Sequence, residues 1–478
     1  MNKKEITLYI SEDGDDSNEG TFEKPLWSVA VALDQVRWKS CETALFIISG
    51  SITEPAALNA MIDITGKGLP VISLQGGNPG CPGILNAQGL EKRVIFVADH
   101  NTLCIGEHII IQGGVTQDCH GGAGITLEDA TLIMRGGEIS NNDCGFGLGG
   151  GVHVGNKSEF IMEGGLITRN KSDMHGGGVF MDEGGIFTMR DGLISGNTAY
   201  VAGGGVFVGV DSKFTHLGGF IKKNKAGGEE NEMFDGLPIP YGEGGGVFVN
   251  EGGSFTLRNG RIVENCAEAF HRQDAYSGSG GGVFIDAGGA FSFEAGSIIQ
   301  NDAMYWGGGV YTAESFTCTH KCLIGGNKAG IGGGGVHIKG REGTFTMKGG
   351  FLINNFAGLI GGAVDITEHC SFIMEGGVVL RNRAAKAGNI FITNGAVVMS
   401  GGVMDNEVSQ PEENLEDVEF SMPSETAGTD VAIDEKGKLI LKGGSFCGVI
   451  SMKHKDQFED LREKKGITEQ LAVNTSPQ

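Results

Sequence analysis

The sequence is poor in proline, in basic residues and in long apolar runs. Only 10 of its 478 residues are proline, which excludes collagen, because the triple helix needs abundant proline and glycine at every third position. Asp and Glu outnumber Lys and Arg by 59 to 36, without any basic cluster, so we expect no nucleic-acid partner. No apolar run approaches the ~20 residues of a membrane-crossing helix, so no membrane-spanning segment is predicted.

The start of the chain and its cysteines say little about the compartment. The opening MNKKEITLYISEDG lacks the apolar stretch of a secretory signal. We therefore expect a cytoplasmic protein, or a secreted or cell-surface protein if a leader has been removed. Among the ten cysteines, Cys318 and Cys322 form a short pair without a second pair at zinc-binding spacing. We interpret Cys318 as a small buried hydrophobe, because other copies of the repeat carry Met or Leu there.

Glycine is abundant, with 85 residues, and it recurs inside a repeat. The stretch GGGVFVNEGGSFTLRNGRIVEN at 244–265 is one of several near-copies. The first valine of the unit falls at Val152, Val179, Val206, Val247, Val283, Val310, Val336 and Val364, in steps of 27, 27, 41, 36, 27, 26 and 28 residues. Fainter copies at Ile125, Ile390 and Val431 bring the array to eleven units. Such periodicity predicts one repeat architecture rather than several globular domains.

Each unit contains three short apolar stretches separated by turn signals. In 244–265 these are Val247 with Val249, Phe255 with Leu257, and Ile262, and their period of two favours strands over a helix. Three strands per coil of about 27 residues, with glycine at the turns, predict an all-β, right-handed parallel β-helix. Asparagines recur after the third strand, and we expect their amides to stack from coil to coil. They are Asn142, Asn170, Asn197, Asn224, Asn265, Asn301, Asn327, Asn355, Asn382 and Asn406.

The open ends of such a stack need covers. Residues 1–65 are predicted to form an N-terminal cap of strand, polar turn, helix and strand. Four apolar residues are expected on the capping helix: Trp27, Ala30, Leu33 and Trp38. Residues 66–450 form the predicted β-helix, and residues 451–478 a charged tail or second cap. Breaks in the period indicate loop insertions at about 226–241, 267–278 and 407–429.

These motifs resemble bacterial right-handed parallel β-helix proteins of the pectin-lyase-like class. The closer resemblance is to surface proteins built from polymorphic outer-membrane protein repeats, which carry a Gly-Gly-Ala-aliphatic motif and a Phe-x-x-Asn motif. The stretch GGAV at 361–364 matches the first motif, whereas most other copies read GGGV. The second motif departs, because most copies here read Ile-x-x-Asn, as at 167–170 and 262–265. The resemblance implies the fold and an adhesin-like role at a bacterial surface.

Two sets of residues are candidates for ligand binding. The insertions at 226–241 and 267–278 follow the same turn of consecutive coils, and insertions in repeat proteins often build the binding face. Their chemistry-bearing residues are Tyr241, Phe270, His271, Arg272, Asp274 and Tyr276. The second set is an outward ladder of aromatic residues between the valines of the first sheet, namely Phe207, Phe248, Phe284 and Tyr311. This ladder admits three explanations: cross-coil packing, a surface covered by loops, or a ligand-binding surface.

Catalytic and metal-binding signals are sparse. His337 and Asp365 occupy consecutive outward positions and could pair, which we interpret as a polar contact at the surface without a third catalytic partner. Acids recur in the turns after the first strand, including Asp182 with Glu183, and we interpret them as solvated residues. The acidic stretch at 13–20 lacks the glycine position and terminal ligand of a calcium loop. No cofactor is therefore predicted, and calcium is the one alternative.

Two functions from different classes remain open. The first is a non-enzymatic surface or secreted β-helical repeat protein, an adhesin-like stalk that displays loops to a host or envelope protein or glycan. The second is a carbohydrate-active enzyme, a polysaccharide lyase, hydrolase or epimerase, acting on an acidic glycan. An enzyme needs a groove with at least two close carboxylates, whereas a binding protein needs only suitable polar and aromatic surface.

Overall fold

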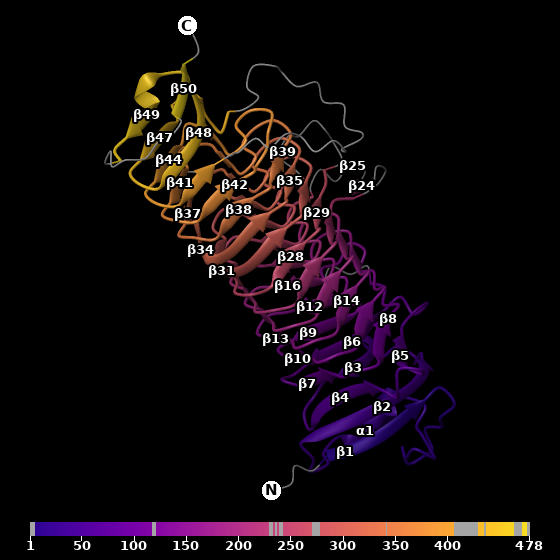
Figure 1. Cartoon of the computed structure of the whole chain (residues 1–478). Helices are drawn as coiled ribbons and strands as arrows, with labels where there is room; N and C mark the ends of the chain where they lie inside the picture. Colours follow the sequence, from indigo (N-terminus) through magenta and orange to yellow (C-terminus); the bar gives the residue numbers. More distant parts are fainter. Residues whose placement is uncertain are drawn as a thin grey trace. The chain divides into compact units, whose positions relative to one another are not determined.

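The computed structural model describes residues 5–116, 121–228, 233–234, 237–238, 242–269, 278–340, 342–405, 429–434, 436–462 and 471–475. The chain divides into two compact units, which are described separately. Unit 1 comprises Met1–Gly242 with Gly246–Phe255, and unit 2 comprises Glu243–Gly245 with Thr256–Gln478. The fold is nearly all β, with 49% strand and 3% helix, and Figure 1 shows successive strands stacked as tiers within each unit. The predicted parallel β-helix is confirmed.

Each coil of unit 1 adds a strand to parallel ladders that we name after the residue repeated on their inner side. The Phe ladder contains β1 (Glu5–Ser11), β2 (Thr43–Ile52), β4 (Val71–Gly76), β7 (Thr102–Ile105), β10 (Thr131–Met134), β13 (Glu159–Met162), β17 (Ile186–Met189) and β21 (Lys213–His216). The Ile ladder contains the end of β2, then β5 (Gly83–Asn86), β8 (Ile109–Gln112), β11 (Glu138–Ser140), β14 (Leu166–Thr168), β18 (Leu193–Ser195) and β22 (Phe220–Lys222). The Val ladder contains β3 (Ala60–Ile64), β6 (Arg93–Ala98), β9 (Ile125–Glu128), β12 (Val152–Val154), β16 (Val179–Met181), β20 (Val206–Val208) and β26 (Val247–Val249).

Unit 2 repeats this arrangement, and β27 (Ser254–Leu257) spans the division between the units. Its Phe ladder runs through β31 (Ala290–Ile299), β34 (Phe316–Gly325), β37 (Thr344–Met347), β41 (Ser371–Met374), β44 (Ala396–Met399), β47 (Lys438–Leu441) and β49 (Phe458–Asp460). Its Ile ladder runs through β28 (Arg261–Val263), the ends of β31 and β34, β38 (Phe351–Ile353), β42 (Val378–Leu380), β45 (Val403–Asp405) and β48 (Ser445–Met452). Its Val ladder runs through β30 (Val283–Ile285), β33 (Val310–Thr312), β36 (Val336–Ile338), β40 (Val364–Ile366), β43 (Ile390–Thr393), β46 (Val431–Asp434), the end of β48 and β50 (Leu471–Thr475).

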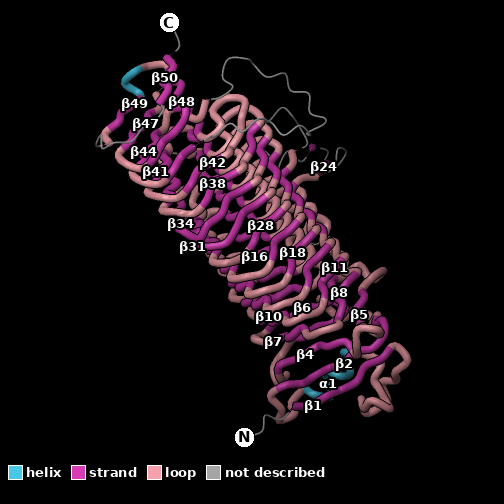
Figure 2. The backbone as a smooth tube through the Cα atoms, in the orientation of Figure 1, coloured by secondary structure: helices cyan, strands magenta, loops and turns pink. Residues whose placement is uncertain are grey.

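A fourth, two-residue strand was not predicted. This strand follows the turn that ends the Ile-ladder strand in each coil. Its two residues pair in parallel with the equivalent residues of the next coil, as Lys171 and Ser172 do with Thr198 and Ala199. In unit 1 these short strands are β15 (Lys171–Ser172), β19 (Thr198–Ala199) and β23 (Lys225–Ala226). In unit 2 they are β29 (Cys266–Ala267), β32 (Asp302–Ala303), β35 (Lys328–Ala329) and β39 (Phe356–Ala357). A small antiparallel pair, β24 (Met233–Phe234) and β25 (Leu237–Pro238), also lies in unit 1. Figure 2 shows how short the loops between successive strands are.

The core consists of columns of identical residues, as the repeat predicted. Phe160, Phe187 and Phe214 are buried, and their rings stack at 4.6 and 4.7 Å between centroids. In unit 2, Phe345 stacks on Phe372 at 5.0 Å. Such ring pairs contribute about 0.5–1.5 kcal/mol beyond the area that they bury. Cys318 and Cys322 are both buried, in agreement with the interpretation of Cys318 as a small hydrophobe.

The triple glycine of the repeat is explained by close backbone approaches. Gly176 has a φ of +66°, and a Cβ there would lie 2.7 Å from the Cβ of Phe180. A Cβ on Gly178 would lie 2.6 Å from the carbonyl oxygen of Gly205 in the next coil. A side chain would therefore clash at both positions: at Gly176, where the main chain crosses over the Val ladder, and at Gly178, where it enters the strand of that ladder.

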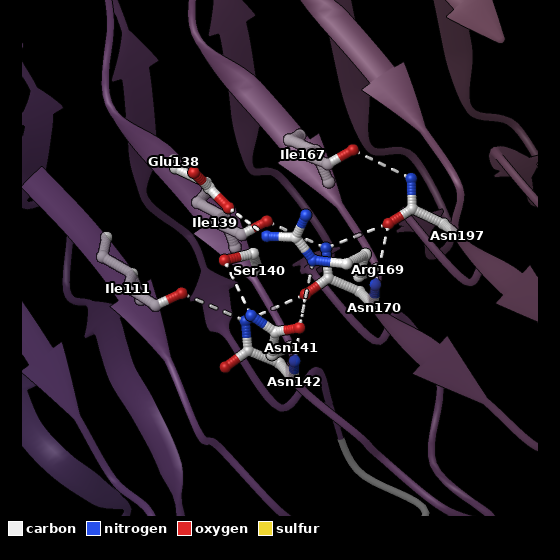
Figure 3. Close-up of polar contacts among 10 residues, drawn as sticks. All are labelled: Ile111, Glu138, Ile139, Ser140, Asn141, Asn142, Ile167, Arg169, Asn170 and Asn197. Atoms are coloured by element: carbon white, nitrogen blue, oxygen red, sulfur yellow. Dashed lines mark hydrogen bonds and ion pairs between the residues drawn. The ribbon is translucent and has the colours of Figure 1, made fainter.

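The stacked asparagines are confirmed within each unit. Asn170 is buried, and its Nδ2 donates to Ile139 O at 2.9 Å and to Asn197 Oδ1 at 3.0 Å (Figure 3). Its own Oδ1 accepts from the backbone N and Nδ2 of Asn142. The amides at Asn301, Asn327, Asn355 and Asn382 repeat this pattern in unit 2. Asn406 lies outside the described residues, and Asn382 instead donates to Asn389 at 3.1 Å.

We predict that Asn197→Asp destabilises the protein by about 2–4 kcal/mol at neutral pH, because the carboxylate cannot donate to Ile167 O and Asn224 Oδ1. Denaturant unfolding at pH 7.5 and pH 5 measures the loss. The penalty should shrink at the lower pH, because protonation restores a donor. Asn156→Asp, at an exposed turn, is the matched control and should cost little. Equal losses in the two variants would contradict a structural role for the amide column.

The N-terminal cap contains the expected helix, but with a different buried face. α1 (Val29–Val36) buries Val29, Ala32, Leu33 and Val36. Of the four residues predicted for the helix, only Leu33 is both helical and buried; Ala30 is exposed, and Trp38 lies beyond the helix with 75% of its surface exposed. The correction follows from the helix beginning at Val29, after its N-cap Ser28, which shifts the apolar stripe. The Glu54 carboxylate accepts from the backbone N of Val29 and of Ala30 and so joins the helix to the first coils.

One residue breaks the Phe-ladder column. His216 occupies the inner position that Met162 and Met189 hold in the preceding coils. It is fully buried, and neither ring nitrogen has a hydrogen-bond partner among the described residues. Burial, only partly offset by the backbone of Gly219 and Gly218, lowers the pKa of His216 to about 4.

We predict that His216→Met stabilises the protein and reduces its sensitivity to acid. The unfolded chain binds a proton at His216 below about pH 6.5, whereas the native state resists it until about pH 4, so native stability falls as the pH drops through this window. The gain from the substitution should therefore grow by about 2 kcal/mol between pH 7.5 and pH 5. Chemical denaturation at both pH values gives the difference. An unchanged pH slope in the variant would show that His216 is solvated.

Candidate functional site

The residues of the two predicted binding loops cannot be placed. Tyr241, Phe270, His271, Arg272, Asp274 and Tyr276 lie outside the described residues. The same holds for most of the insertion at 226–241 and of that at 267–278, and for nearly all of the insertion at 407–429. Their role in binding stays a prediction.

The aromatic ladder lies beneath a covering layer. Phe207, Phe248 and Phe284 are each only 6% exposed, and Tyr311 is half-buried. In unit 1 the His175 ring, on the segment that precedes the triple glycine, lies 4.6 Å from the Phe207 ring. The covering segments of successive coils pair in parallel, as at Leu148, His175 and Ala202. These rings therefore fill a second apolar layer outside the Val ladder, which favours the packing explanation and leaves a ligand little surface to contact.

His337 and Asp365 do pair, but not at the surface. His337 Nδ1 lies 2.7 Å from Asp365 Oδ2, and the two side chains are 2% and 0% exposed. The predicted solvated contact is corrected to a buried pair, because Trp306 of the covering layer lies over the His337 ring at 4.6 Å. Removing one partner of such a pair is strongly destabilising. Its burial also keeps Asp365 out of reach of a polymeric substrate.

One concave site in unit 1 is an acidic cleft at the ends of the Val-ladder strands. Its volume is about 430 Å³. It is lined by Ala98, Asp99, Glu128, Asp129, His153, Gly155, Asn156, Lys157 and Asp182. Apart from His153, which lies at the centre of β12, each polar residue comes from the turn that follows β6, β9, β12 or β16, or from the end of the strand itself. Parallel stacking therefore brings them to one place. Four carboxylates thus face a single lysine.

His153 forms the floor of this cleft. It is the outward residue of β12 and only 6% exposed, and its ring stacks on Phe180 at 5.5 Å with 7° between the planes. Neither ring nitrogen has a hydrogen-bond partner among the described residues. Nε2 lies 3.7 Å from Asp182 Oδ2, beyond hydrogen-bond distance but within range of an ion pair. Both nitrogens are themselves shielded from solvent, so the ring is an unsatisfied polar group at the base of the cleft.

The carboxylates of the cleft differ in how far they are already engaged. Asp99 accepts from the backbone N of Gly66 at 2.7 Å, and Asp129 pairs with His100 at 3.1 Å. The interaction with His153, helped by the Glu183 N–H, holds the pKa of Asp182 below its usual value. Glu128 is exposed and has no hydrogen-bond or ion-pair partner among the described residues. Asp182 and Glu128 are thus the charged groups best placed to meet a ligand.

The sequence contained the signals for this cleft, but they were assigned separately. In the sequence, His153 alternates with Val152 and Val154 and so falls on the outward side of the first sheet, whereas Asp182 was interpreted as a solvated turn acid. The missing step was that strand ends of consecutive coils lie ~4.8 Å apart, so turn residues from four coils converge. Left-handed backbone at Asp99, Asp129 and Lys157 keeps these turns tight.

Unit 2 holds a second group of perturbed acids around Tyr311. Burial, together with the nearby charge of Asp286, raises the pKa of Glu243 to about 7. Burial and the charges of Glu243 and Glu368 also raise the pKa of the Tyr311 hydroxyl. Such perturbation marks functional sites and structural networks alike.

Among the described residues, no group of three or more His, Cys, Asp or Glu side chains is arranged to hold a metal ion. The acidic stretch at 13–20, the calcium alternative, uses its carboxylates within turns. Asp16 accepts from the backbone N of Trp27 and Ser28, and Asp15 accepts from that of Ser17. These bonds account for Asp15 and Asp16, and calcium binding at this stretch stays an untested alternative.

A search of the described helices finds none with the length and apolar character of a membrane span.

Comparison with known proteins adds no assignment. No protein-family model matches the chain, and neither a curated protein nor a solved structure shows significant similarity to it.

Proposed function

We propose that this chain is a non-enzymatic surface or secreted β-helical repeat protein, adhesin-like or ligand-binding, whose acidic cleft contacts a host or envelope protein or glycan. The observation that carries the proposal is the cleft itself. It gathers four carboxylates, an asparagine, a lysine and a buried histidine whose ring nitrogens are unpartnered among the described residues. The resemblance to polymorphic outer-membrane protein repeats supports the same class of function.

The architecture supports binding over catalysis. Ligand contacts in a repeat stack come from turns, which accept substitution, while the ladders hold them in fixed register. The outward aromatic positions are occupied by packing, and the one buried His–Asp pair is covered by Trp306. In the cleft, polar groups from successive coils converge with room for a ligand.

We predict that Glu128→Gln with Asp182→Asn reduces ligand retention on a host and envelope protein and glycan array by about tenfold or more, because the two carboxylates best placed to meet a ligand lose their charge. The matched control is Asp211→Asn with Glu251→Gln. Those acids are exposed in the equivalent turns of later coils of unit 1 and do not line the cleft. Equal binding by the parent and the cleft variant would place the ligand site elsewhere.

The alternative is a carbohydrate-active enzyme, and one observation favours it: His153 and several carboxylates share one cleft. The charge of that cleft opposes it, because four carboxylates against one lysine repel an acidic glycan. We therefore predict no turnover of polygalacturonate or alginate, with or without calcium, in assays for unsaturated or reducing-end products. Product formed by the parent and lost in Asp182→Asn would establish the enzyme instead.

A further inference from the structure

We infer that the acidic cleft of unit 1 is a binding site for the guanidinium group of an arginine in a basic segment of a partner protein. The inference rests on the proposed function and narrows its ligand. It is drawn from the charge, the floor and the size of the cleft and from the character of its lining.

The charge of the cleft selects a cation. Asp99, Glu128, Asp129 and Asp182 surround it, whereas Lys157 is the one lining residue with a positive side chain. His100, outside the lining set, pairs with Asp129 at the edge and is largely exposed. A concave surface lined by one sign of charge concentrates ligands of the opposite sign and speeds their association. The whole chain adds to this field, with a net charge of −23.

The floor of the cleft supplies an acceptor at depth. His153 is 6% exposed, and neither of its ring nitrogens has a hydrogen-bond partner among the described residues. Such a buried polar group gains stability when a ligand satisfies it. Both ring nitrogens are shielded from solvent, so a cation reaches Nε2 only by displacing Asp182 Oδ2, which lies 3.7 Å away. A neutral imidazole nitrogen and that carboxylate can then each accept an N–H of the same group.

Guanidinium fits this pair of acceptors better than ammonium does. Its planar fork presents five donors and pairs with carboxylates through two parallel hydrogen bonds, whereas ammonium acts as a point charge. The volume of about 430 Å³ lies at the lower end of the range for small-ligand sites, ~300–1,000 Å³. One arginine side chain with a neighbouring residue is a ligand of that order.

The lining disfavours a glycan. Sugar rings commonly pack on aromatic side chains, and no Phe, Tyr or Trp lines the cleft. The His153 ring has one face against Phe180. A protein segment needs no such platform, since its charged side chain makes the contact.

The test uses the full chain and calorimetric titration with three probes at low and physiological salt: an acetylated Gly-Arg-Gly-Arg-Gly amide, the same peptide with citrulline for arginine, and a chitosan oligosaccharide. We expect binding of the arginine peptide, at least ~10-fold weaker binding of the citrulline peptide, and a loss of affinity as salt rises. Glu128→Gln with Asp182→Asn should weaken the arginine peptide by about tenfold or more, while Asp211→Asn with Glu251→Gln should leave it unchanged.

A second variant separates the contribution of the His153 ring from that of the negative charge of the cleft. His153→Phe removes the ring nitrogens and places in the ladder the residue found at Phe180 and Phe207, so it should fold, as thermal melting will check. We expect it to weaken the arginine peptide several-fold without changing the salt dependence. Equal affinity for the arginine and citrulline peptides, or equal loss in the control variant, would overturn the inference.

The outcomes also separate this inference from the broader proposal. If the chitosan oligosaccharide or an array glycan binds and is lost in the cleft variant while the arginine peptide does not bind, the cleft is a ligand site and the guanidinium assignment is wrong. If the arginine peptide binds in the cleft but the array retains no ligand, the guanidinium site stands and the adhesin-like function fails.

Discussion

Parallel pairing of each strand with its equivalent one coil away is the constraint on which the rest of this structure depends. It sets identical positions ~4.8 Å apart, so every residue meets a near-copy of itself. Apolar side chains can satisfy that rule by stacking, as the rings of Phe160, Phe187 and Phe214 do. Charged groups inside the coil cannot, because like charges would be stacked in low dielectric. Asparagine is the polar residue that tolerates self-stacking, since its amide both donates and accepts.

The same rule makes exceptions informative. His216 stands in a column of methionines, and His337 and Asp365 stand in a column of aromatics. The histidine–aspartate pair satisfies the rule by complementarity, one rung supplying what the next requires. His153 has no such partner at hydrogen-bond distance. The His153 side chain instead lines the acidic cleft, which lies outside the column.

Much of the fold could be predicted from the sequence because the same pattern of apolar residues, glycines and asparagines recurs in each coil. The inward phenylalanines, the stacked amides and the parallel ladders all followed from period and alternation. The short strands such as β15 were missed because two residues carry no periodic signal. The helix face was wrong because Trp27 and Trp38 were counted as apolar positions, while the helix starts only at Val29. The cleft was not predicted because its residues come from four coils and are far apart in the sequence. Only the stacking of these coils brings their turns together. The buried state of His337 and Asp365 was unreadable because it depends on Trp306, about thirty residues away in the preceding covering segment.

The direction of the amide bonds has a consequence for how such a protein changes in length. Each asparagine donates to the one that follows and accepts from the one before, so every interior member has the same needs and a coil can be duplicated or deleted without leaving an amide unsatisfied. Only the ends are particular. At the first member of the column in unit 1, the Oδ1 of Asn142 accepts from the backbone N of Gly114. In unit 2 Asn382 donates to the side chain of Asn389, seven residues further along the chain. Coil number is thus free to vary by gene duplication, whereas the residues that open and close the column are fixed by chemistry, and relatives with more or fewer coils should retain those closing residues.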